Sequence, residues 1–141
     1  MIRKYKETDI EALLDVWYKA TVVAHPFLGN AFLQKEKKKI REVYIPITET
    51  WVFQNEDGLD GFISMMGNEV GAIFVRPEKH GQGIGRKLMD FVHQFHKTLE
   101  VEVFKDNKIG RTFYDKYGFK IIKESIHEET QQDLLRMRLD S

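Results

Sequence analysis

Residues 75–89, VRPEKHGQGIGRKLM, contain three glycines at alternate positions, followed by two basic residues, Arg86 and Lys87. The glycines are Gly81, Gly83 and Gly85. Glycine lets the backbone turn tightly and present its N–H groups on one side, because no Cβ stands in the way. The apolar spacing that follows predicts a helix over residues 84–96, whose unpaired first amides and positive dipole end would lie at this turn. Such a turn binds anions, most often phosphate. The segment therefore predicts a site for a phosphorylated ligand; the alternative is a glycine-rich turn without a ligand before an ordinary helix.

The spacing of these glycines excludes two common phosphate-binding loops. A dinucleotide-binding fold needs G-x-G-x-x-G, and here Arg86 occupies the place of the third glycine. A nucleoside triphosphate loop needs Gly-Lys followed by Ser or Thr, and that tripeptide does not occur in the sequence. What remains is the shorter pattern [RQ]-x-x-G-x-[GA], placed after an apolar strand that ends in Val-x-Pro, with His80 at its first position.

Asn107 and the segment F-Y-x-x-x-G-F at residues 113–119 form a second pattern further along the chain. Together the two patterns resemble the motifs of the GCN5-related N-acetyltransferases, in the order in which that family has them. His80 is a departure, because arginine or glutamine is usual at that position. Three looser features are similar to a small bacterial subgroup of the family proposed to acetylate protein lysines or other amines. They are H-P-F-L at residues 25–28, W-V-F at 51–53 and E-E-T-Q-Q at 128–132.

The resemblance implies that the protein binds acetyl-CoA as a cosubstrate and uses no metal. It places the pyrophosphate on the glycine loop and the pantetheine arm along the strand before it, near Asn107. A backbone amide of that strand would polarise the thioester oxygen. The implied cofactor-binding residues are Ile73, Phe74, Val75, His80, Gly81, Gln82, Gly83, Ile84, Gly85, Arg86, Asn107 and Tyr114.

Tyr114 is the residue to which the resemblance assigns the role of general acid. Acetyl transfer to an amine expels coenzyme A as a thiolate, whose pKa is near ~8.5. The phenol, with a reference pKa of ~10, stays protonated at neutral pH and can donate to the departing sulfur. Assistance of this kind contributes roughly 10²–10⁴ in rate. Tyr117 fits the motif less well and is expected to serve packing.

The attacking amine must lose a proton, and the sequence leaves three candidates for the group that takes it. Glu69 lies on the strand that leads to the loop, at a distance that resembles the general base of some family members. His25 lies in the segment that forms one wall of the acceptor site in the family, and histidine titrates near neutral pH. Ordered water is the third candidate. His25 and Phe27 are the expected acceptor-binding residues; alternatively, His25 merely begins a turn.

Composition limits the class of protein. With 141 residues, 42% of them hydrophobic and 31% charged, the chain has the size and composition of one soluble domain, residues 1–141. A net charge of +0 gives no reason to expect a nucleic acid or a membrane as partner. No cysteine is present, which excludes disulfides, a cysteine nucleophile and thiolate metal sites. Because the sequence shows neither an apolar leader nor an apolar run of membrane-spanning length, a cytoplasmic protein is expected.

Apolar periodicity and turn signals predict the elements that would hold these residues in place. Thr8 and Glu11 match a capping box, which predicts the start of the first helix. Helices are expected over residues 9–23, 31–44, 84–96 and 109–117, and strands over residues 2–5, 51–54, 59–66, 69–75, 100–104, 120–127 and 134–139. The order β-α-α-β-β-β-α-β-α-β-β resembles the acetyltransferase fold from end to end. It implies a mixed α/β fold whose central sheet, mixed but mostly antiparallel, has six to seven strands and is flanked by about four helices.

These observations predict an acetyl-CoA-dependent N-acetyltransferase that acts on a primary amine such as a protein lysine. The amine would attack the thioester directly in a ternary complex. The alternative is a non-catalytic acyl-CoA-binding regulatory module. The protein is expected to be a monomer or a homodimer. Acidic residues near the last two strands are expected to attract a cationic acceptor: Glu124, Glu128, Glu129 and Asp133.

Overall fold

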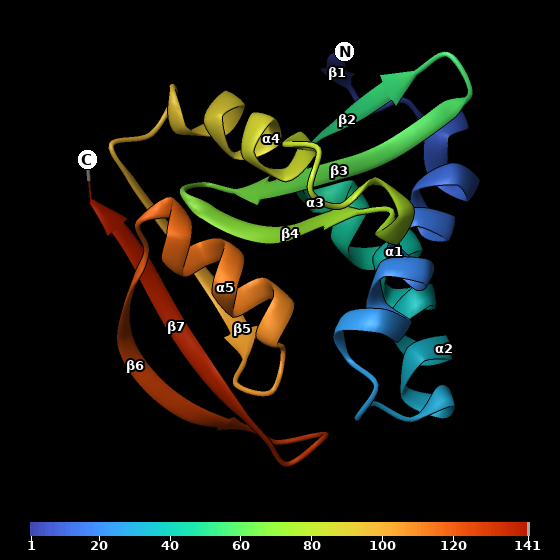
Figure 1. Cartoon of the computed structure of the whole chain (residues 1–141). Helices are drawn as coiled ribbons and strands as arrows, with labels where there is room; N and C mark the ends of the chain where they lie inside the picture. Colours follow the sequence, from blue (N-terminus) through green and yellow to red (C-terminus); the bar gives the residue numbers. More distant parts are fainter. Residues whose placement is uncertain (141) are drawn as a thin grey trace.

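One sheet of seven strands organises the computed structural model, which describes residues 1–140; Ser141, the last residue of the predicted domain, lies outside that range. The elements follow each other in the predicted order, with α3 as an added single turn (Figure 1). The strands are β1 (Ile2–Lys4), β2 (Glu49–Asn55), β3 (Gly58–Met66), β4 (Glu69–Val75), β5 (Thr98–Phe104), β6 (Lys120–His127) and β7 (Gln132–Asp140). The helices are α1 (Ile10–Ala24), α2 (Asn30–Lys39), α3 (Ile45–Ile47), α4 (Ile84–His93) and α5 (Lys108–Tyr117). Two 3₁₀ turns, Glu7–Asp9 and Pro77–Lys79, and one π-helical turn, Ile40–Tyr44, lie between them.

The sheet has the strand order β1-β2-β3-β4-β5-β7-β6, and every neighbouring pair except β4 and β5 is antiparallel. The parallel pair is short, since only Glu69 and Val70 of β4 lie opposite residues of β5. In the β3–β4 pair the register shifts by one residue at Gly71, which is therefore a bulge in β4. Beyond the bulge the two parallel strands separate (Figure 1). The predicted mixed, mostly antiparallel sheet is confirmed.

Helices cover both faces of the sheet, as the sequence predicts. The α1–α2 face buries a cluster that includes Leu13, Trp17 and Phe62. The opposite face carries α4 and α5, and there Leu88 of α4 and Phe119, which follows the end of α5, are fully buried in the larger cluster. Removal of these apolar side chains from water is the main force that holds the layers together. Within residues 1–140, none of the helices has the length and apolar character needed to cross a bilayer.

Two local predictions are wrong, and both concern helix ends. Thr8 does not cap α1, which has no side-chain cap. Instead the carboxylate of Asp9 accepts a hydrogen bond from the Lys6 backbone at 2.8 Å and pairs with the guanidinium of Arg3 at 2.8 Å. A tertiary ion pair thus replaces the expected capping box. At the other site, α4 ends at His93, three residues before the predicted end at position 96.

Candidate active site

A cavity of about 870 Å³ opens where β4 and β5 separate. Both strands, the loop before α4, and helices α1, α2 and α5 contribute to its walls. Most residues that the sequence singles out line it: His25, Glu69, Ile73, Phe74, Val75, His80, Gly81, Gly83, Ile84, Gly85, Arg86, Asn107 and Tyr114. Two predicted site residues, Gln82 and Phe27, are not among the residues that line this cavity. Gln82 is exposed, and Phe27 lines a smaller pocket beside the cavity.

The edge of β4 that faces the cavity has free backbone groups. The Arg76 amide donates to the carbonyl of Asp60 on β3 at 2.8 Å. Because alternate residues of an antiparallel strand face the same neighbour, Phe74 also points its N–H toward β3, whereas Ile73 and Val75 point theirs away from it. The Val75 carbonyl on this edge already accepts a hydrogen bond from Nε2 of His80 at 2.9 Å, so the amide of Val75 and the amide and carbonyl of Ile73 are the groups that remain. The cavity is therefore bordered by a strand edge that can pair with an extended ligand.

The glycine loop has the conformation that anion binding requires. Gly81 and Gly83 both adopt left-handed backbone angles, with φ of 82° and 81°. A Cβ at either position would meet nothing within 4 Å, so the conformation, and not crowding, demands glycine there. No side chain caps α4, whose first backbone hydrogen bond runs from Lys87 to Gly83 at 3.0 Å. The amides of residues 84–86 are therefore without a partner in the helix.

The third glycine of the loop has a different task from the one that the sequence suggests. Gly85 lies inside α4 and does not have a positive φ. A Cβ there would approach the ring of Phe113 on α5 to 3.1 Å. Gly85 therefore allows α4 and α5 to pack closely.

Positive charge surrounds the loop, although not all of it comes from the predicted residues. The guanidinium of Arg86 lies over the Tyr117 ring at 5.4 Å and lines the cavity. Lys87 is turned to the ring of Phe53, at 5.8 Å. Lys79 and Lys116, which the sequence patterns did not single out, also line the cavity. These side chains give this end of the cavity a positive character that suits a phosphate group.

Tyr114 and Tyr117 differ in ways that separate chemistry from packing. Tyr114 is 7% exposed, lines the cavity, and its hydroxyl has no hydrogen bond to another residue in the described range 1–140. Burial raises its pKa well above the usual range, so the phenol stays protonated. The hydroxyl of Tyr117 donates to Asp90 of α4 at 2.5 Å. Tyr117 thus connects two helices, whereas the Tyr114 hydroxyl remains available as a donor.

Carboxylates from three elements line the cavity: Glu69 at the start of β4, Glu102 on β5 and Glu36 on α2. Glu69 lies 3.5 Å from the guanidinium of Arg136, which also binds Glu100 at 2.6 Å and approaches Glu102 to 3.9 Å. Glu36 of α2, a residue that the sequence patterns missed, lines the cavity too, and burial raises its pKa. No motif or spacing around Glu36 in the sequence indicates that it faces a site, because this follows only from which face of α2 is turned to the cavity. No group of three or more histidine, aspartate or glutamate side chains within residues 1–140 could hold a metal.

His25 and Asn107 meet in the wall of the cavity. Both are 8% exposed, and Nδ2 of Asn107 lies 3.0 Å from Nε2 of His25. Burial lowers the pKa of His25 to about 4. Two buried polar atoms nearby, Nδ1 of His25 and the hydroxyl oxygen of Thr21, have no partner among the described residues. A neutral, engaged imidazole of this kind is poorly suited to accept a proton from an amine.

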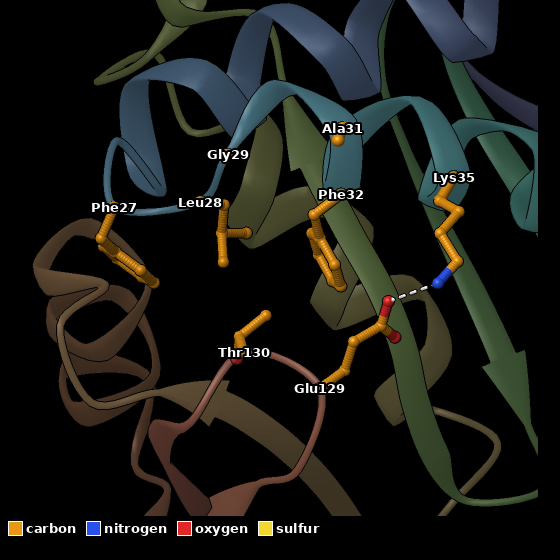
Figure 2. Close-up of a pocket in the computed structure, with 8 residues that line it drawn as sticks. All are labelled: Phe27, Leu28, Gly29, Ala31, Phe32, Lys35, Glu129 and Thr130. Carbon is orange, nitrogen blue, oxygen red and sulfur yellow. Dashed lines mark hydrogen bonds and ion pairs between the residues drawn. The ribbon is translucent and has the colours of Figure 1, made fainter.

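The smaller pocket, of about 350 Å³, lies between α2 and the turn that joins β6 to β7 (Figure 2). Lys35 crosses it to bind Glu129 at 3.0 Å, and Lys39 approaches the same carboxylate to 3.7 Å. Leu28 and Phe32 line both this pocket and the large cavity. Among the acidic residues predicted to attract an acceptor, Glu129 is therefore already paired with lysines.

Comparisons with known proteins agree with this geometry. A family model described as "Acetyltransferase (GNAT) domain" matches residues 46–121. The chain is 33% identical over 132 residues to peptidyl-lysine N-acetyltransferase YiaC of Escherichia coli (strain K12), covering 93% of this chain and 90% of that protein. It is 30% identical over 125 residues to peptidyl-lysine N-acetyltransferase YjaB of Salmonella typhimurium, covering 88% of this chain and 86% of that protein.

Solved structures share the fold over nearly the whole chain. The solution structure of the apo form of YjaB from Escherichia coli has a TM-score of 0.88 at 27% identity, covering 98% of this chain and 95% of that one. The PaiA N-acetyltransferase of Thermoplasma acidophilum, in complex with coenzyme A, has a TM-score of 0.81 at 19% identity, covering 100% and 98%.

Proposed function

Because the chain belongs to the GNAT acetyltransferase family and is an N-acetyltransferase, we propose that it transfers the acetyl group of acetyl-CoA to the side-chain amine of a protein lysine. One observation carries the proposal: a left-handed glycine loop at the N-terminus of α4 and the free edge of β4 border the same cavity. Two curated relatives that match most of the chain are named peptidyl-lysine N-acetyltransferases, which supports lysine as the acceptor. A protein with this fold binds coenzyme A.

Acetyl-CoA would lie along the cavity with its pyrophosphate at the loop. The unpaired amides at the start of α4 and the positive end of its dipole suit two negative phosphates. Arg86, Lys79 and Lys116 line this end of the cavity and add mobile charge. The backbone of Ile73 and Val75 would pair with the amides of the pantetheine arm. One of these N–H groups would also stabilise negative charge on the thioester oxygen as the amine adds.

The reaction forms a bond between the amine nitrogen and the acetyl carbon, and the carbon–sulfur bond breaks. Tyr114 would give its proton to the departing thiolate, since its hydroxyl is protonated and has no competing partner among residues 1–140. A lysine with pKa ~10.4 needs about 4.6 kcal/mol to lose its proton at pH 7. We assign that proton to Glu69, which lines the cavity on the strand that leads to the loop.

The proposal includes three further points. Residues 1–141 would act as a single cytoplasmic domain. Its oligomeric state, monomer or homodimer, stays a prediction. The cavity-lining carboxylates Glu36, Glu69 and Glu102 would attract the cationic acceptor, together with the exposed Glu128 and Asp133 near the last two strands, since Glu124 and Glu129 are already paired with lysines.

Two measurements test the proposal. Titration calorimetry of the purified protein with coenzyme A should detect binding, and release of free thiol from acetyl-CoA should require an amine, with a lysine peptide among the best acceptors. Mass spectrometry of the peptide should locate the acetyl group on the lysine side chain. Binding of coenzyme A without thiol release for any amine would favour the non-catalytic acyl-CoA-binding module instead.

A further inference from the structure

A buried contact between two residues that are 82 positions apart joins the residue that follows α1 to the start of α5. It runs from the carboxamide of Asn107 to Nε2 of His25, at 3.0 Å. Asn107 is the N-cap of α5, and its Oδ1 accepts from the Gly110 amide at 2.9 Å. Both residues line the large cavity. The contact therefore fixes a helix start at the wall of the proposed acetyl-CoA site.

The donor and acceptor in each hydrogen bond of this series, from Gly110 through Asn107 to His25, follow from the partners of Asn107. The Gly110 amide can only donate, so the Asn107 atom that it meets is the carbonyl oxygen Oδ1. The atom that faces His25 is then the Nδ2 amide, which can only donate, and Nε2 of His25 must accept. An imidazole that accepts at Nε2 and is neutral carries its proton on Nδ1. The low pKa of His25, about 4, keeps the ring neutral.

The surroundings leave the Asn107 carboxamide little freedom. A Cβ at position 110 would lie 2.6 Å from Nδ2 of Asn107, so only glycine leaves room for the carboxamide in this orientation. The imidazole of His25 is held in turn by edge contacts with the rings of Phe27 and Phe104, at centroid distances of 5.6 and 5.4 Å. The ring orientation that makes Nε2 an acceptor is thus fixed by packing.

We infer that His25 is a positioning residue, which holds the Asn107 carboxamide and through it the first turn of α5 for acetyl transfer. The inference rests on the proposed function, because α5 also carries Tyr114, two turns after Asn107. His25 uses its Nε2 lone pair on Asn107 and so does not take the proton of the acceptor amine. This role replaces the contact with the acceptor that the sequence suggested.

Two substitutions at position 25 separate the possible roles. His25→Phe keeps an aromatic ring in the packing but removes the acceptor, which leaves a buried amide unpaired and should lower kcat/KM roughly tenfold or more. His25→Gln offers a carbonyl oxygen to the same amide and should recover most of the activity. Equal activity of His25→Phe and wild type would show that only packing matters. Equal loss in both variants would show that the imidazole itself does chemistry. Either result overturns the inference.

A readout without turnover distinguishes failure of this inference from failure of the proposed function. Nitrogen NMR of the imidazole should show a protonated Nδ1 and an unprotonated Nε2 for His25 from pH 5 to 8, with or without activity in the assay. A proton on Nε2, or titration near the ordinary pKa of ~6.5, would refute the contact. Gly110→Ala, which crowds the carboxamide, should lower kcat/KM like His25→Phe while the His25 ring stays neutral; unchanged activity in Gly110→Ala would also count against the inference.

Discussion

Replacing Tyr114 by phenylalanine should separate the chemistry of this site from its stability. The ring keeps its contacts with Phe113 and Phe119, at centroid distances of 5.6 and 5.5 Å. The hydroxyl that is lost has no hydrogen bond to another residue within 1–140. Since Tyr114 lines the cavity and its hydroxyl breaks no hydrogen bond with the protein when it is removed, the free energy of unfolding should change by less than about 1 kcal/mol.

The catalytic effect of the same change should be large. Loss of a general acid lowers the rate by roughly 10²–10⁴, which corresponds to about 3–5 kcal/mol of transition-state stabilisation. The loss should appear in kcat, while the affinity for coenzyme A measured by calorimetry should stay within about threefold, because the loop and the β4 edge are untouched. Thiol release from acetyl-CoA with a lysine peptide, measured at neutral pH, gives the rate.

Tyr117→Phe is the matched control, since it removes a phenol from the same helix. Its hydroxyl binds Asp90 at 2.5 Å, so the variant should lose about 1 kcal/mol of stability in denaturant unfolding and keep a rate within about threefold of wild type. Tyr114→Phe turning over at the wild-type rate would remove the phenol from the mechanism. A loss of turnover in Tyr117→Phe comparable to that in Tyr114→Phe would mean that the rate reports α5 packing and not acid catalysis.

Three further predictions address the loop, the base and the buried histidine. Gly83→Ala places a side chain on a residue with left-handed backbone angles, which costs about 1–2 kcal/mol. Calorimetry should therefore show roughly tenfold weaker binding of coenzyme A. Unchanged affinity would contradict a loop held in this conformation for the ligand. Glu69→Gln should lower kcat/KM for a lysine peptide at least tenfold. The control Glu102→Gln removes another cavity-lining carboxylate near Arg136 and should not lower kcat/KM to this extent. Similar losses in both variants would indicate that Glu69 only attracts the cationic acceptor. The pKa of His25 falls from ~6.5 unfolded to about 4 folded, so the unfolded chain binds more protons and stability is lost as pH falls from 6.5 to 4. The loss reaches at most about 3 kcal/mol, and denaturant unfolding of His25→Gln should show a correspondingly smaller loss over that range.

The sequence predicts the glycine loop and the helices beside it well because its signals are local. The glycines, the helix that follows and the F-Y-x-x-x-G-F segment each specify an element and its neighbouring turn. The order of elements and the sheet follow from apolar periodicity for the same reason. Even here the alternate spacing predicts a turning role for Gly85, whereas in the structure Gly85 permits close packing against Phe113, a residue of another helix. The prediction for Gly85 is wrong because the residue that requires glycine there, Phe113, is distant in the sequence.

The contacts that define charge and orientation at the site join segments far apart in the sequence. Arg136 meets Glu69 across 67 positions, and Asn107 meets His25 across 82. Neither pair leaves a periodic or spacing signal, because the first depends on how β4 and β7 are placed in space and the second on how α1 and α5 are placed. The same reason explains the helix start at Asp9, where Arg3 competes for the carboxylate that a local pattern would have left free.

The short parallel pair in the sheet explains why the parts of the site converge. Parallel strands cannot be joined by a tight turn, so the chain must cross from β4 to β5 through a helix, α4, whose N-terminus lies at the carboxyl end of β4. β5 runs in the same direction and ends beside it, so α5, with Asn107 at its start and Tyr114 further along, begins at the same edge. Because only two residue pairs hold β4 to β5, the strands separate beyond them and leave the edge of β4 free. The glycine loop, the strand edge and the phenol therefore come together through topology, whereas no such constraint places α2 and the β6–β7 turn, which line the smaller pocket.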